Sequence, residues 1–134
     1  EQINKIISII NNNKYRNVGI LVSDNEMVLE IMNSFTASKF ACEFKYNAGY
    51  NDSRNKDTLN FKTERPKLMT YHSAKGLQFE TVIIPFFKGA RNTDEKKALY
   101  VAMTRTYRNL YVLYDGILQE PLKSVPERLY EKGE

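Results

Sequence analysis

The chain has 134 residues, 42% of them hydrophobic and 27% charged, and carries a formal net charge of +4. This length and composition predict one globular domain, residues 1–134, and exclude a disordered chain. One cysteine and one histidine exclude an internal disulfide and a zinc site. No apolar run approaches the ~20 residues that a membrane span needs. We therefore expect a soluble, cytoplasmic protein without a membrane or metal site, in which Cys42 is buried and unreactive.

The first half of the chain alternates helix and strand. Isoleucines at helical spacing predict an amphipathic helix over 2–12, and the apolar run 18–22 is typical of a strand buried on both faces. Residues 23–35 combine capping side chains with an apolar stripe, which predicts a second helix. Alternation over 42–46 predicts another strand, with Glu43 on its polar face. The polar stretch 47–64 is expected to be a loop and the most mobile part of the chain.

The second half continues the alternation. Strands are expected over 67–71, 80–87 and 110–114. Between the last two, Thr93 would cap a helix that runs to about Tyr107. A short helix is expected around 127–131. Strands alternating with helices predict an α/β fold with a mostly parallel sheet.

The stretch 68–79 reads as a strand that enters a turn of small residues. Thr70 and His72 stand two apart, so on a strand they would share one face, where both could donate to a phosphate oxygen. Residues 73–76 would expose backbone amides at the start of a helical turn, a second anion site. The alternative is a satisfied histidine at an ordinary strand-to-helix junction, and the residues alone favour that alternative.

The stretch 98–106 predicts a helix that carries Arg105 near its C-terminal end. A guanidinium held there could reach a phosphoryl group that is being transferred. Without further context, a solvated arginine is the favoured interpretation. The sequence contains neither a Gly-x-x-x-x-Gly-Lys-Ser/Thr loop nor a Gly-x-Gly-x-x-Gly motif. The chain therefore lacks the usual means of binding a nucleoside triphosphate by itself. Its net charge of +4 permits a polyanionic partner but does not by itself predict one.

The context comes from a resemblance that spans most of the chain. Residues 70–80 (TYHSAKGLQFE) resemble motif V of superfamily 1 DNA helicases of the UvrD/Rep type, and residues 98–106 (ALYVAMTRT) resemble motif VI. Residues 18–35 resemble the motif IV strand and helix, and 124–130 the family's C-terminus. The motifs occur in the family's order. The resemblance implies a RecA-like three-layer α/β/α fold with a mostly parallel sheet of about five strands.

In this family, motifs IV to VI belong to the second RecA-like motor domain. The first motor domain, with the P-loop and the Mg²⁺ ligands, is absent from this chain, and the chain does not begin with Met, so we expect it to be a piece of a larger protein. The resemblance implies that the full-length protein uses ATP and Mg²⁺ as a helicase, and that the isolated domain is inactive. Its expected partners are single-stranded DNA and the missing N-terminal motor domain.

The resemblance also implies roles for particular residues. Arg105 would be the catalytic arginine finger at the γ-phosphate. Gly76 would approach the phosphates with its backbone, and Gln78 stands where the family usually has a glutamate near the ribose. The DNA-binding residues would be Thr70, His72 and Ser73.

Three features depart from the family pattern. Ser23 occupies the place of a Tyr-Arg pair whose arginine reaches the nucleotide, and residues 96–97 are Lys-Lys instead of Arg-Arg. The short stretch 47–64 stands where UvrD and Rep insert a large extra domain, which places the chain nearer to compact helicases. Ser23 and Gln78 keep a second hypothesis open, a degenerate, non-catalytic RecA-like module that binds nucleic acid or protein.

Overall fold

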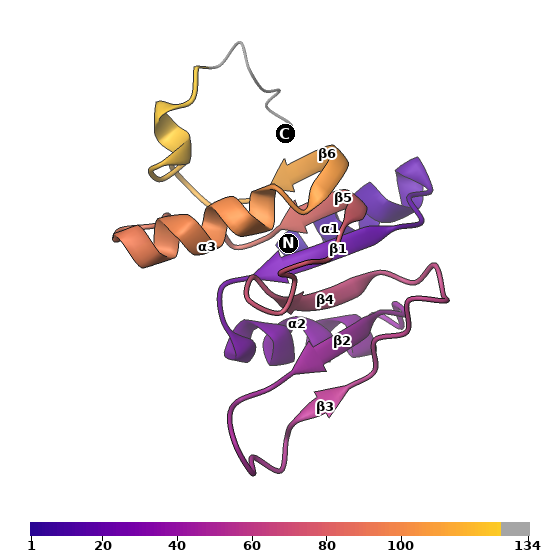
Figure 1. The fold of residues 1–134 in the computed structure, drawn as a ribbon. Coiled ribbons are helices and arrows are strands. Elements are labelled where there is room, and N and C mark those ends of the chain that lie inside the picture. Colours follow the sequence, from indigo (N-terminus) through magenta and orange to yellow (C-terminus); the bar gives the residue numbers. More distant parts are fainter. Residues whose placement is uncertain (127–134) are drawn as a thin grey trace.

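A single six-stranded sheet runs through the molecule. The computed structural model describes residues 1–126, and the helix expected around 127–131 lies outside them. The strand order is β3-β2-β4-β1-β5-β6, and all neighbours are parallel except β2 and β3 (Figure 1). The predicted mostly parallel sheet is confirmed, with six strands where about five were expected. The strands are β1 (Val18–Val22), β2 (Glu43–Tyr46), β3 (Lys56–Asp57), β4 (Lys67–Thr70), β5 (Phe79–Ile84) and β6 (Thr106–Val112).

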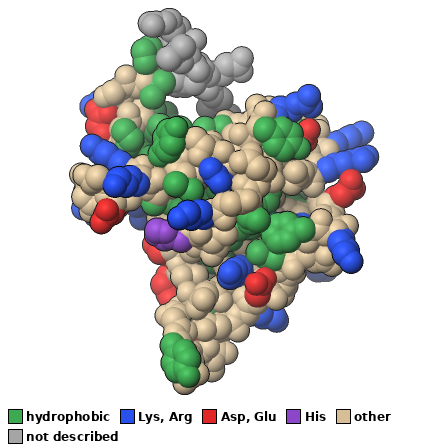
Figure 2. All heavy atoms as spheres, viewed as in Figure 1, with side chains coloured by type: hydrophobic (Ala, Val, Ile, Leu, Met, Phe, Trp, Pro, Cys, Tyr) green, Lys and Arg blue, Asp and Glu red, His purple; other side chains and the backbone are tan. Residues whose placement is uncertain are grey.

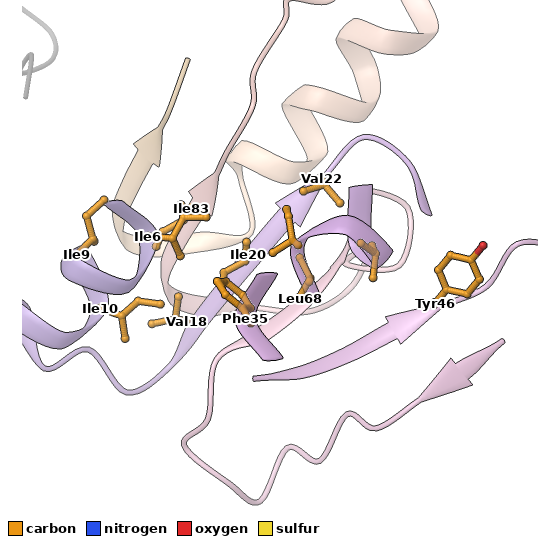
Figure 3. Close-up of a cluster of buried hydrophobic side chains, with 12 residues drawn as sticks. Ile6, Ile9, Ile10, Val18, Ile20, Val22, Phe35, Tyr46, Leu68 and Ile83 are labelled. Atoms are coloured by element: carbon orange, nitrogen blue, oxygen red, sulfur yellow. The ribbon is translucent and has the colours of Figure 1, made fainter. Parts of the chain in front are cut away.

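Helices cover both faces of this sheet and give the expected three layers. On one face, α1 (Gln2–Asn13) and α2 (Asn25–Ala37) pack a core against the central strands (Figure 3). On the other face, α3 (Thr93–Met103) contributes to a second core. Alternate residues of β1 point into the two cores, so every residue of this strand is buried. The domain therefore has the α/β arrangement that the RecA-like resemblance implied.

The border between α3 and β6 differs from the sequence-based expectation. The helix begins after Asn92, whose side chain accepts a hydrogen bond from the Glu95 amide at 2.8 Å, and not after Thr93. It ends at Met103, and β6 begins at Thr106, four residues earlier than predicted. Pairing with β5 is the cause, because the Phe79 amide donates to the Arg105 carbonyl oxygen at 2.8 Å. This long-range pairing overrides the local helical pattern.

The polar stretch 47–64 is more ordered than a simple loop. It contains β3, which pairs antiparallel with the end of β2. The prediction of a plain loop here was wrong, because side-chain amides and a short strand pairing organise the segment without any apolar pattern.

Candidate functional site

The predicted site residues are divided between the two ends of the parallel strands. Thr70 ends β4 at the carboxyl end of the sheet, beside its register partner Val22 in β1. Arg105 directly precedes β6, at the amino end. Because β5 also runs parallel to β1, residues 71–78 must cross from one end of the sheet to the other before β5 can start. We call this stretch the crossing segment.

Thr70 is an internal cap of the turn that opens the crossing segment. It is only 5% exposed, and its Oγ1 accepts from the Ser73 amide and donates to the Ser73 hydroxyl, both at 3.2 Å. The expectation that Thr70 and His72 share a strand face was wrong, because β4 ends at Thr70 and His72 lies in the turn, where it is exposed. Of the two side chains, His72 is the accessible one.

The backbone amides of this turn are mostly used within the turn. The Ser73 amide donates to Thr70 Oγ1, the Ala74 amide to the Thr70 carbonyl at 3.2 Å, and the Lys75 amide to the His72 carbonyl at 3.2 Å. The predicted row of free amides over 73–76 is therefore largely wrong. Gly76 remains open, because no heavy atom beyond its two chain neighbours lies within 4 Å of the place where a Cβ would stand, and its φ of +87° is a conformation that favours glycine.

A cleft of about 970 Å³ opens at the carboxyl ends of the strands, with His72 in its wall. Its acidic lining comes mainly from the first turns of α2 and α3, where carboxylates offset the helix dipoles. These side chains are Asp24, Glu26, Glu30, Asp94 and Glu95, against the cations Lys88 and Arg91. An anionic strand is therefore better placed over the exposed turn than deep in the cleft. On the face seen in Figure 2, Lys and Arg side chains stand beside the histidine.

Arg105 lies two residues beyond the end of α3 and folds back onto it. Its Nε donates to the Val101 carbonyl at 3.0 Å, and its Nη2 donates to the Thr104 hydroxyl at 3.3 Å. The partly negative carbonyl end of a helix stabilises a guanidinium in this position. The side chain is half-buried, so its direction is set while part of the guanidinium still faces outward.

The amino end of β5 brings Gln78 close to Arg105 in the fold. Gln78 is exposed and precedes Phe79, which pairs with Thr106 and whose amide donates to the Arg105 carbonyl. Two residues expected at a nucleotide thus lie at one end of the sheet, and the residues expected at DNA lie at the other. Within residues 1–126, no three His, Cys, Asp or Glu side chains gather as metal ligands.

Comparison with known proteins concerns the stretch of sequence that contains these residues. Residues 67–113 match the model of the UvrD-like helicase C-terminal domain. The predicted resemblance is confirmed. Residues 67–113, which we call the UvrD-like segment, contain every predicted site residue, from Thr70 to Arg105, and the whole crossing segment.

A solved structure extends the similarity to the fold of the whole chain. It is the C-terminal domain of a possible DNA helicase from Lactobacillus plantarum WCFS1, with 18% sequence identity and a TM-score of 0.70. The match covers 96% of this chain and 75% of that one. At this identity the likeness concerns the fold, including the parts outside the UvrD-like segment. No curated protein matches the chain in sequence. None of the helices among residues 1–126 has the length and apolar character to cross a membrane.

Proposed function

We propose that this domain is the second motor domain of an ATP-dependent DNA helicase or translocase. The observation that carries the proposal is the eight-residue crossing segment, which joins His72 at one end of the sheet to Gln78 at the other. ATP would bind at the amino end, in the interface with a first motor domain. The single strand would bind at the carboxyl end.

The amino end of the sheet, where ATP would bind, has side chains suited to an anionic ligand. Arg105 presents a guanidinium that is pre-oriented by Val101 and Thr104, and Gln78 offers an exposed amide for a ribose hydroxyl. ATP supplies the phosphoryl group that is transferred, and Arg105 stabilises the negative charge that develops on it. Gly76 lets the backbone come close to the phosphates, because it carries no side chain. The Mg²⁺ ligands would come from the first motor domain.

The crossing segment would couple the two ends mechanically. Ala74 and Leu77 pack into the second core, so the segment is fixed to the sheet. Arg105 and Gln78 would contact ATP when the interdomain cleft closes around it. This closure would therefore shift the contacts of His72 and Ser73 along the strand.

Substitution of Arg105 tests the proposal. In the full-length protein, Arg105→Ala should lower DNA-stimulated ATP turnover by roughly 10³-fold or more, as expected for an arginine finger. Arg105→Lys should recover only part of this loss, because lysine cannot donate to two acceptors in a fixed plane. Phosphate release at saturating ATP and oligonucleotide measures the effect.

Arg108→Ala is the matched control. Arg108 is exposed, lies at the same end of β6, and pairs with Glu80 at 3.3 Å. Its loss should change turnover less than about twofold, since exposed pairs contribute little. Undiminished turnover in Arg105→Ala would refute the assigned role.

A non-catalytic binding module is the second candidate. It is favoured by Ser23, whose hydroxyl donates to Asp24, the N-cap of α2, at 3.5 Å and to the Met27 sulfur at 3.3 Å. The end of β1, at the carboxyl end of the sheet, then lacks the arginine that the family pattern has there. A P-loop and an Asp-Glu pair in the first domain would favour the motor, and their loss would favour the module.

A further inference from the structure

The 47–55 hairpin, which joins β2 to β3, projects from the domain (Figure 1). Its tip carries Tyr50, which is 96% exposed. Figure 2 shows hydrophobic side-chain atoms at the end of this projection. A ring this exposed contributes nothing to the hydrophobic core, so folding stability does not explain why an aromatic residue stands at position 50.

The tip is held in one conformation by side-chain amides. Asn55 accepts from the Ala48 amide at 2.8 Å and donates to the Gly49 carbonyl at 2.7 Å. Asn47 accepts from the Gly49 amide at 3.1 Å. The Asp52 amide also donates to the Gly49 carbonyl at 3.3 Å, so the backbone is fixed on both sides of Tyr50 and the ring is presented from an ordered support.

The base of the hairpin is fixed to the body of the domain. The Asn47 amide donates to the Asn25 side chain at 3.0 Å, at the start of α2. Arg54 pairs with Asp52 at 3.0 Å and lies over the Tyr46 ring, 5.4 Å from its centre. Asp52 and Arg54 are the two charged residues of the hairpin, and they neutralise each other. The hairpin therefore offers a ring rather than a net charge.

The hairpin stands at the carboxyl end of the sheet. Phe44 of β2 pairs with Leu68 of β4, and two residues further on both strands end, at Tyr46 and Thr70. The hairpin thus leaves the sheet beside the strand end that leads to His72. A single strand gripped by His72 would pass near this side of the domain.

We propose that Tyr50 is a stacking platform for a base of single-stranded nucleic acid bound at the carboxyl end of the sheet. This inference rests on the proposed function. Every base has a π-face, so an exposed tyrosine on a rigid support binds bases without sequence preference and without needing charge. Phosphate contacts at His72 and base contacts at Tyr50 would then act on the same strand.

The test measures binding of the purified chain to a fluorescein-labelled oligothymidylate by anisotropy at low salt. Tyr50→Ala should weaken binding about tenfold, and Tyr50→Trp should keep or strengthen it, as expected for base stacking. An abasic strand of equal length should bind Tyr50→Ala and the unaltered chain equally. The salt dependence should not change, because no phosphate contact is lost. Asn55→Ala should give a smaller loss, because the ring is kept and its support is loosened.

Tyr107→Ala is the matched control, since Tyr107 is 65% exposed but lies in β6, at the amino end of the sheet. It should bind the strand like the unaltered chain. If Tyr50→Ala binds normally while His72→Ala binds weakly, the inference about Tyr50 is overturned and the proposed function stands. If the unaltered chain binds no strand at all, both are contradicted. Equal losses in Tyr50→Ala and Tyr107→Ala would also overturn the stacking role.

Discussion

At the scale of single residues, a buried ion pair holds the chain between β3 and β4 against the sheet. Lys67 Nζ lies 3.1 Å from Glu43 Oε1, and both side chains are 6% exposed. The Thr63 hydroxyl and the Asn60 amide donate to the same carboxylate, and Lys67 also donates to the Arg65 carbonyl. Every charge here has partners, which makes its burial tolerable.

This pair predicts a loss of stability in acid. Burial alone would raise the pKa of Glu43, but the hydrogen bonds from Thr63 and Asn60, with the charge of Lys67, hold it below its usual value. A lowered pKa in the folded state gives stability that is complete above the unfolded pKa of ~4.3 and is lost as the pH falls through the folded pKa. Urea unfolding at a series of pH values measures this loss.

Glu43→Gln separates this contribution from the rest. It should destabilise the domain by roughly 3 kcal/mol at neutral pH, because Lys67 stays buried without a counter-charge, and it should flatten the acid dependence. Glu64→Gln, which removes an exposed pair with Arg16 at 3.5 Å, should do neither. An unchanged acid dependence in Glu43→Gln would contradict the assignment.

At the scale of elements, β1 is packed so closely that one of its residues has to be glycine. A Cβ on Gly19 would lie 2.6 Å from the ring of Phe79, which is 1% exposed. The ring of Phe79, at the start of the neighbouring strand β5, therefore lies directly against the backbone of β1.

Gly19→Ala should destabilise the domain by about 1–3 kcal/mol, because the buried ring must move. Urea unfolding measures the change. In the double variant with Phe79→Leu, the combined cost should be smaller than the sum of the two single costs, since the smaller side chain makes room. Additive costs would show that Phe79 is not what excludes the methyl group.

At the scale of the whole molecule, the predicted site residues lie on two separate surfaces, one at each end of the sheet. Arg105 and Gln78 stand at one end of the sheet, and His72 and the 47–55 hairpin at the other. We expect the purified chain to release no measurable phosphate from ATP with Mg²⁺, with or without single-stranded DNA. Hydrolysis that disappears in Arg105→Ala would contradict this prediction.

Weak, salt-sensitive binding to single strands is expected from the same chain, because phosphate contacts are few and electrostatic. The half-buried Cys42 should not interfere with such measurements. Burial raises the pKa of its thiol to about 12, so almost no reactive thiolate forms at neutral pH.

Much of the fold was predictable because its signals are local. Hydrophobic periodicity placed α1, β1 and α2 within a residue or two, and the spacing of residues 70–80 and 98–106 indicated the helicase resemblance. The start of β6, the existence of β3 and the burial of Glu43 escaped prediction. Each of these depends on a strand or loop that is distant in the sequence.

The sequence by itself determined the order of the elements other than β3, the two motif segments and the identity of the charged and aromatic side chains. Only the tertiary structure decided which end of the sheet each of them occupies. The physical reason is that parallel strands force residues 71–78 across the sheet, so His72 and Gln78, six positions apart in sequence, come to serve opposite ends. Tyr50 likewise joins His72 at one end through strand pairing alone.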